Sequence, residues 1–211
     1  MKILSINNAF QPSITAFSEN EKIIFSITAY QKDDWPNNIL YVTKTMFDSL
    51  GIAPKDIELV SVVYGPGSFT GTRVGVIEGK ITSYALNIPI VPVNSLKFIA
   101  AHFKEEVHPI LPAGKNEYFI AKFNNGERVE KDRIEKKEFL KEINGILVSP
   151  CEEIKDIISN LIIINPDPEV LISLTLKEYA DGNIFKDPLS LNPLYLHAID
   201  TIFKKYKNGR N

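Results

Sequence analysis

The sequence contains one cysteine, Cys151, in 211 residues. A single cysteine excludes an intramolecular disulfide and is typical of a protein from a reducing compartment. Because no histidine is near it in the sequence, we interpret Cys151 as a small apolar residue of the interior. Long apolar runs are also missing: Leu161–Ile164 is far shorter than a membrane span, and Met1–Ile6 is too short for a signal peptide. We therefore expect a cytoplasmic protein that does not enter a membrane.

Histidine is also rare, with three in the chain. His102 and His108 do not have the spacing of a helical metal pair, and the chain has no His-Glu-x-x-His motif. His197 stands alone in the sequence. The net charge of −2 gives no general attraction to nucleic acid or to a membrane. The sequence thus predicts no metal ligand and no catalytic residue, and a metallopeptidase is excluded.

Glycine, by contrast, is concentrated in one place. Val60–Tyr64 is an apolar segment rich in β-branched residues, typical of a buried strand, and Val74–Leu86 has a helical rhythm. Between them lies a segment that we call the glycine loop, with these residues of interest: Gly65, Pro66, Gly67, Ser68, Phe69, Thr70, Gly71 and Arg73. The sequence predicts a strand, a tight turn and a helix capped by Ser68 or Thr70.

The glycine spacing matches neither common nucleotide motif. A Walker A loop needs Gly-x-x-x-x-Gly-Lys-Ser/Thr, but the glycine loop has a longer gap from Gly65 to Gly71 and then Thr72-Arg73. The dinucleotide fingerprint needs Gly-x-Gly-x-x-Gly and an acid at the end of the next strand, which Pro89–Val93 lacks. Two interpretations remain: a helix N-terminus that binds an anion, or a tight turn without a ligand.

The helix after the loop carries two stripes of side chains. One stripe consists of small residues at every fourth position: Gly71, Gly75, Gly79 and Ser83. Each helical glycine costs about 1 kcal/mol relative to alanine, so this stripe indicates close packing against a neighbour. The other stripe is bulky: Val74, Ile77, Ile81 and Tyr84. Either one stripe faces the sheet and the other packs within the domain, or the helix has a second buried face against a partner.

The order of elements predicts an α/β fold with a mixed sheet and helices on its faces. The chain opens with three expected strands: Lys2–Ile6, Ser13–Ser18 and Lys22–Tyr30. Helices are expected over Asp34–Leu50, before the glycine loop, and over Ser95–Phe103 after it. In the second half, short strands surround an expected helix at Glu152–Asn160, and a further helix is expected at Pro168–Ala180.

The motif Gly65-Pro66-Gly67-Ser68-Phe69-Thr70-Gly71-x-Arg73-x-Gly75 resembles the signature of the TsaB family, also called YeaZ. Near the end, Asn192-Pro193-Leu194-Tyr195-Leu196 is similar to the closing Pro-x-Tyr-Leu of that family. The resemblance implies two ribonuclease-H-like subdomains of the actin, Hsp70 and sugar-kinase superfamily, the C-terminal one smaller and degenerate. We expect the N-terminal subdomain, with the glycine loop and the partner-binding helices, at 1–104 and the C-terminal α/β subdomain at 105–211.

The TsaB family is the non-catalytic companion in bacterial synthesis of threonylcarbamoyladenosine in tRNA. The resemblance implies that the chain binds TsaD as a heterodimer and keeps that enzyme active, with TsaE and ATP completing the cycle and tRNA reached only indirectly. It also implies a homodimer when the chain is alone. The expected partner interface consists of Leu40, Thr43, Lys44, Phe47, Val74, Ile77, Ile81 and Tyr84. The alternative is a diverged homodimeric or weakly nucleotide-binding member of the same superfamily.

The chain departs from the family pattern at its first hairpin. TsaB-like chains usually carry Asp-Thr-Ser there, whereas this sequence has Asn7-Asn8-Ala9. An amide has no charge for a hard cation, so we expect no cofactor on this chain alone and leave ATP or ADP to the interface of the complex. Arg73 is expected to cap the glycine loop, to reach a carboxylate across an interface, or to form a salt bridge inside the domain. The basic tail at 204–210 is either a frayed terminus or a contact to tRNA phosphate.

Overall fold

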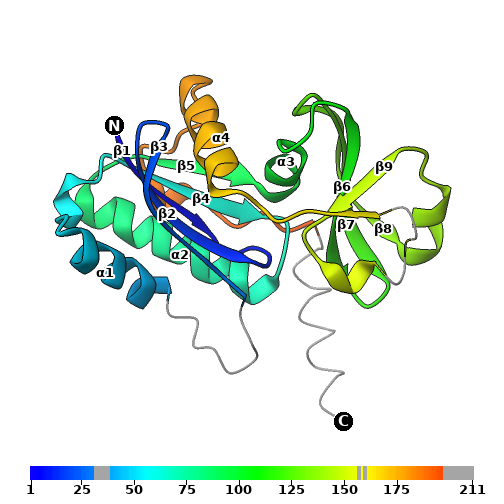
Figure 1. Ribbon diagram of the computed structural model, residues 1–211, viewed down its shortest axis with the longest axis horizontal. Helices are drawn as coiled ribbons and strands as arrows, with labels where there is room; N and C mark the ends of the chain where they lie inside the picture. Colours follow the sequence, from blue (N-terminus) through cyan, green and yellow to red (C-terminus); the bar gives the residue numbers. More distant parts are fainter. Residues whose placement is uncertain (31–38, 156–157, 159–160, 197–211) are drawn as a thin grey trace, which may run out of the picture.

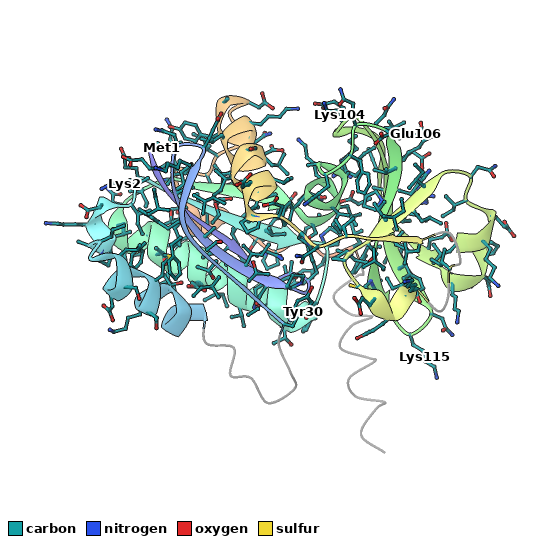
Figure 2. All side chains as sticks on the ribbon, in the orientation of Figure 1. Met1, Lys2, Tyr30, Lys104, Glu106 and Lys115 are labelled. Carbon is teal, nitrogen blue, oxygen red and sulfur yellow. The ribbon has the colours of Figure 1, made fainter. Side chains whose placement is uncertain are left out.

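The computed structural model describes residues 1–30, 39–155, 158 and 161–196, with side chains throughout except at 39–42. These residues form two lobes, each built on a five-stranded sheet (Figure 1). The second lobe begins near Lys104 and Glu106, which lie at its upper edge in Figure 2. The prediction of an α/β fold with mixed sheets is confirmed.

The first sheet has the strand order β3-β2-β1-β4-β5. Its strands are β1 (Lys2–Asn7), β2 (Ser13–Glu19), β3 (Lys22–Ala29), β4 (Leu59–Gly65) and β5 (Ile90–Asn94). β1 pairs antiparallel with β2 and parallel with β4, while β5 continues the parallel half. This mixed pattern is the ribonuclease-H-like arrangement that the resemblance implied. It places the carboxyl ends of β1 and β4 side by side, where the glycine loop and the first hairpin meet.

The second sheet repeats the topology of the first, with the order β10-β9-β6-β7-β8. Its strands are β6 (Glu106–Gly114), β7 (Glu117–Asn124), β8 (Glu127–Lys136), β9 (Ile146–Ser149) and β10 (Leu161–Ile163). The first three strands pair antiparallel, and β6, β9 and β10 pair in parallel, as their counterparts do in the first sheet. The two lobes therefore share one strand pattern, although the sequence shows no internal repeat.

Among the described residues there are four α-helices, of which three pack on the first lobe and one, the third in chain order, lies between the lobes and packs mainly on the second sheet (Figure 1). They are α1 (Ile39–Leu50), α2 (Phe69–Leu86), α3 (Ser95–Ala100) and α4 (Pro168–Ala180). α1 and α2 lie on one face of the first sheet, and α4 lies on the other. Four short 3-10 turns complete the described part: Pro54–Asp56, Lys137–Glu142, Glu152–Ile154 and Pro188–Ser190.

Two helix predictions were partly wrong. The helix expected from Ser95 to Phe103 is only six residues long, and Asn94 caps it by accepting a hydrogen bond from the Lys97 amide at 3.0 Å. The helix expected at Glu152–Asn160 is a single 3-10 turn over Glu152–Ile154, as far as the described residues go. The expected start of the first helix near Asp34 lies outside the described residues.

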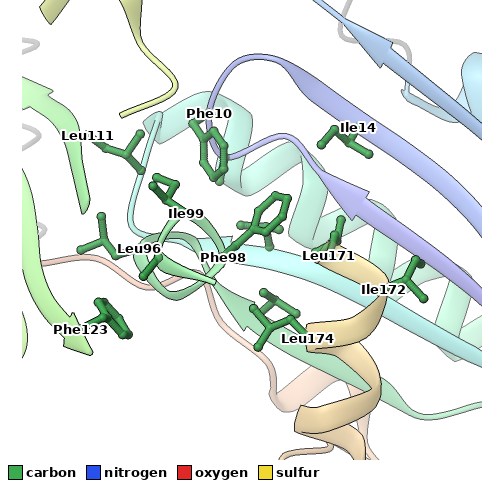
Figure 3. Close-up of a cluster of buried hydrophobic side chains, with 14 of the residues drawn as sticks. Phe10, Ile14, Leu96, Phe98, Ile99, Leu111, Phe123, Leu171, Ile172 and Leu174 are labelled. Atoms are coloured by element: carbon green, nitrogen blue, oxygen red, sulfur yellow. The ribbon is translucent and has the colours of Figure 1, made fainter. Parts of the chain in front are cut away.

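The largest apolar cluster joins the two lobes (Figure 3). α4 brings Leu171, Ile172 and Leu174 into this cluster, where they pack with Phe98 of α3. A buried hydrogen bond of 2.7 Å between the hydroxyls of Ser61 and Thr175 also fixes α4 to the first sheet. α4 therefore belongs to the core of the first lobe, although the sequence had assigned its residues to the second subdomain.

Candidate functional site: the glycine loop and the face of helix α2

The glycine loop packs directly on the hairpin between β1 and β2. A Cβ atom added at Gly67 would lie 2.2 Å from the carbonyl oxygen of Ala9, and one added at Gly71 would lie 2.2 Å from that of Asn8. No side chain fits at such distances, so both positions require glycine. The Ser68 amide donates to the Ala9 carbonyl at 2.7 Å, which ties the loop to the hairpin.

The N-terminus of α2 is capped by a side chain of the glycine loop. Ser68 is the cap, and its hydroxyl accepts a hydrogen bond from the Gly71 amide at 3.2 Å. Thr70, the other predicted cap, lies on the exposed side of the first turn. Because the hairpin backbone fills the space in front of Gly67 and Gly71, the geometry favours the tight turn over the anion site.

Asn7 holds the hairpin together from the inside. Its buried side-chain amide donates to the carbonyls of Phe10 and Pro12 at 3.2 and 3.0 Å. Its Oδ1 atom accepts from the Ala9 amide at 3.1 Å. A carboxylate cannot donate hydrogen bonds, so an aspartate would leave both carbonyls without this donor. The departure from the family pattern at Asn7 thus has a structural role in this chain.

The C-terminal segment returns to the first lobe and closes over the glycine loop. The Leu194 amide donates to the carbonyl of Tyr64 at 2.8 Å, and the Leu194 carbonyl lies 2.8 Å from the place of a Cβ atom on Gly65. The next residue, Tyr195, accepts a hydrogen bond of 2.6 Å from Nε of Arg73. The segment similar to the family's closing motif is therefore part of the site.

Arg73 lies against two neighbouring aromatic rings. Its guanidinium carbon lies 3.7 Å from the centre of the Phe69 ring and 5.5 Å from that of Tyr195. In the part of the chain that the structure describes, Arg73 forms no ion pair with a carboxylate. The expected salt bridge inside the domain is therefore replaced by stacking and one hydrogen bond to a hydroxyl.

The small-residue stripe of α2 faces the first sheet. A Cβ atom added at Gly75 would lie 3.2 Å from Cβ of Asn8, and one added at Gly79 would lie 3.3 Å from Cβ of Val62. The helix axis can therefore approach the sheet closely. The opposite side of α2 is exposed and apolar: Ile77, Ile81 and Tyr84 have exposed fractions of 54%, 57% and 64%. Val74 is half-buried and packs beside the α1 residues.

Helix α1 contributes less to the surface than the sequence predicted. Thr43 and Phe47, expected at the partner interface, are buried in this chain with exposed fractions of 6% and 7%. Phe47 packs against Phe17 of β2, which orients this part of α1 toward the sheet. Lys44 is exposed and pairs with Asp48 at 2.5 Å. The side chain of Leu40 lies outside the described residues.

A buried carboxyl group between α1 and α2 was missed in the sequence. Glu78 of α2 has an exposed fraction of 3%, and its Oε1 atom accepts a hydrogen bond of 2.8 Å from the Thr43 hydroxyl. Its Oε2 atom has no hydrogen-bond partner among the described residues. Burial raises the pKa of Glu78 to about 7, and the hydrogen bond from Thr43 opposes part of that rise. Glu78 stands four positions after Val74, so it lies on the same side of the helix as the bulky stripe. This spacing is the signal in the sequence that could have indicated its burial.

A polar cleft of about 460 Å³ lies between the lobes, at the end of β5. Lys97 and Glu178 form an ion pair of 2.5 Å in it, and Asn183 donates to the same carboxylate at 2.5 Å. Asn94 donates to Asp132 of the second lobe at 2.7 Å. These hydrogen bonds and the ion pair join polar groups across the cleft and so connect the two lobes.

Two further reactive side chains of the described part of the chain, Cys151 and His102, lie in structural surroundings. Burial raises the pKa of the Cys151 thiol to about 11, which keeps it protonated. His102 accepts a hydrogen bond from the Asp167 amide at 3.0 Å and serves packing. Among the described residues, no cluster of histidine, cysteine, aspartate or glutamate side chains is suited to a metal ion. No helix in the described ranges combines the length and apolarity that a membrane span requires.

These features define the chain as a two-lobed α/β protein of the ribonuclease-H-like class, whose glycine loop is closed by its own hairpin. The model of the family TsaD, tRNA N6-adenosine threonylcarbamoyltransferase, matches residues 23–150. "tRNA threonylcarbamoyladenosine biosynthesis protein TsaB" of Bacillus subtilis (strain 168) is 29% identical over 131 residues, which cover 60% of this chain and 57% of that protein. The chain belongs to the TsaB/YeaZ family.

Two further comparisons concern the fold and a short part of the sequence. "YeaZ from Pseudomonas aeruginosa" superposes with a TM-score of 0.75 at 17% identity, covering 92% of this chain and 99% of that one, which shows a shared fold. A tRNA N6-adenosine threonylcarbamoyltransferase of Carboxydothermus hydrogenoformans is 43% identical over 58 residues. The chain matches 57% of the Bacillus protein's length and 17% of the Carboxydothermus protein's length, so the similarity in sequence is partial.

Proposed function

We propose that this chain is a non-catalytic scaffold subunit that binds and activates TsaD in threonylcarbamoyl transfer to the adenosine next to the tRNA anticodon. The observation that carries the proposal is the exposed apolar face of α2, formed by Ile77, Ile81 and Tyr84. Three large apolar side chains on successive turns of one helix form a surface suited to a partner helix. Family membership supplies the pathway, since the Bacillus relative is named for this modification.

A role without catalysis is supported by the first hairpin. Asn7 offers an amide where active members of the superfamily use an acid, and that amide is already engaged with Phe10 and Pro12. The glycine loop is occupied by the backbone of Asn8 and Ala9. We therefore assign no cofactor to the chain by itself. ATP or ADP is proposed to bind only in the assembled complex, which also contains TsaE and reaches tRNA through TsaD, in the cytoplasm.

The alternative is a diverged homodimer that uses the same α2 face, or a weak nucleotide binder. Self-association is compatible with the exposed apolar side chains, because an isologous dimer needs one self-complementary patch. The two functions differ in the effect that added TsaD has on a homodimer of this chain. A scaffold for TsaD exchanges a homodimer for a heterodimer when TsaD is added, whereas a dedicated homodimer does not.

The test is size exclusion with light scattering on the chain alone and mixed with TsaD of the same organism. We expect a stable heterodimer and, with TsaE and ATP present, tRNA modification that depends on this chain. Ile81→Glu places a charge in the α2 face and should abolish the heterodimer while the protein stays folded. Val129→Glu is the matched control, because Val129 is 54% exposed, close to the 57% of Ile81, but lies on β8 of the other lobe.

An absence of heterodimer with the wild-type chain, with and without nucleotide, would contradict the scaffold function. Equal binding by the wild-type and Ile81→Glu chains would place the partner on another surface. Loss of binding in the Val129→Glu control would point to general damage rather than to the α2 face.

A further inference from the structure

Arg73 lies at one end of the exposed face of α2. The residues Arg73, Ile77, Ile81 and Tyr84 follow one another at spacings of four, four and three, so they share one side of the helix. The three apolar members are more than half exposed. Arg73 therefore adds a positive charge to a surface that is otherwise apolar.

The guanidinium group of Arg73 is fixed before any partner arrives. The Phe69 ring covers one face of it, with its centre 3.7 Å from the guanidinium carbon. The Tyr195 hydroxyl accepts a hydrogen bond of 2.6 Å from Nε. Tyr195 is itself held in place, because the preceding Leu194 amide donates to the Tyr64 carbonyl at 2.8 Å. These contacts use the Nε side of the group. The two terminal nitrogens, which form the other edge of the planar fork, have no hydrogen-bond partner among the described residues.

A fixed fork with free terminal nitrogens is suited to a carboxylate, which can accept two parallel hydrogen bonds. Holding the side chain in advance reduces the rotamer entropy lost on binding. Within the described residues of α1 and α2, a second copy of this chain offers no exposed carboxylate that lacks a partner. The acid of α2, Glu78, is buried beneath α1, and the exposed Asp48 of α1 is already paired with Lys44.

We propose that Arg73 receives an aspartate or glutamate carboxylate from the protein that docks on the α2 face, and that this ion pair selects a different polypeptide over a second copy of this chain. The inference rests on the proposed function, which makes TsaD the docking partner. The partner surface is then an apolar helix face with one acidic side chain opposite Arg73. Tyr195 and Phe69 act as positioning residues that hold the fork.

The experiment measures the Kd of the full chain for TsaD of the same organism by calorimetry, at low and at moderate salt. Arg73→Gln removes the charge and should weaken binding about tenfold at low salt and reduce the salt dependence. Arg73→Lys keeps the charge but not the fork, and should also weaken binding. Tyr195→Phe keeps the ring and the net charge, and should weaken binding about threefold by freeing the fork. Lys22→Gln, an exposed cation on β3, is the matched charge control.

An unchanged Kd in Arg73→Gln, with Ile81→Glu still unable to bind, would overturn the inference and leave the proposed function standing. No binding by the wild-type chain would overturn the proposed function and with it the inference. If Arg73→Gln fails to fold, Arg73→Lys and Tyr195→Phe serve as the test instead. Wild-type affinity in both variants would overturn the inference. Weakened affinity in both, with an unchanged melting temperature, would support it. A homodimer that weakens as much as the heterodimer in Arg73→Gln would overturn the claimed selection against a second copy.

Discussion

Replacing Glu78 by glutamine should make the protein more stable at neutral pH. The carboxyl group is 3% exposed, accepts one hydrogen bond from Thr43 and has a second oxygen without a described partner. Ionising it in this place is costly, so its pKa in the folded chain rises from 4.5 to about 7. In the unfolded chain the carboxyl group ionises at its ordinary pKa. The folded state therefore binds the proton more tightly than the unfolded state does.

The sign and size of the effect follow from that difference. Below pH 4.5 the carboxyl is protonated in both states, and its contribution to stability is complete. Between pH 4.5 and about 7 the unfolded state ionises first, so stability falls as the pH rises. The loss amounts to about 3 kcal/mol at pH 8, at about 1.4 kcal/mol for each unit of pKa. Glutamine keeps the acceptor for Thr43 and carries no charge, so Glu78→Gln escapes this loss.

The assay is urea unfolding of the wild-type and Glu78→Gln chains from pH 4 to pH 8. The difference in unfolding free energy between them should be small at pH 4 and reach about 3 kcal/mol in favour of the variant at pH 8, a midpoint shift of about 1 to 2 M urea. Glu21→Gln, in an exposed turn, is the control and should leave the wild-type pH profile unchanged. A difference between wild type and Glu78→Gln that is the same at every pH would refute the reasoning.

Two further predictions concern the glycine loop and the cysteine. Gly67→Ala should destabilise the chain by about 3 kcal/mol in urea unfolding, because its Cβ would lie 2.2 Å from the Ala9 carbonyl oxygen. The control, Gly126→Asn, should change the stability little, because Gly126 lies in an open turn with a positive φ that asparagine accepts. Equal effects of the two substitutions would refute the predicted clash. Cys151 should react with iodoacetamide at pH 8 more than about 100-fold slower in the folded than in the urea-unfolded chain, because its pKa is about 11 when folded; equal rates by mass spectrometry would contradict this.

Local features of the first lobe could be predicted from the sequence because short-range patterns determine them. In the three opening strands, apolar residues alternate with polar ones or form short runs. Ser68 directly precedes the helix, and the glycines of α2 recur at every fourth position. The two stripes of α2 were recognised, and Gly75 and Gly79 indeed face the sheet. Which stripe faces outward could not be decided, since both are free of charge and fit either environment.

Features that join distant segments could not be predicted in this way. Arg73 and Tyr195 are 122 positions apart, and neither residue type indicates the other. The apolar positions of α4 show that it packs on a sheet, but not that it returns to the first lobe. In α1 the apolar residues extend around more than one side, so Thr43 and Phe47 were placed on the surface although they face inward.

The closed loop and the exposed face of α2 have a common structural cause. Gly67 and Gly71 let the loop rest on the hairpin, and Gly75 and Gly79 let the helix continue at the same short distance from the sheet. A helix that lies so close is fixed along its whole inner side, so its outer side is presented as a rigid surface. In this chain the four glycines thus hold α2, the helix proposed to dock the partner, in position. Under the proposed function, the same packing predicts that substitutions in the glycine loop weaken partner binding even though the loop lies beside the exposed face of α2 and not within it.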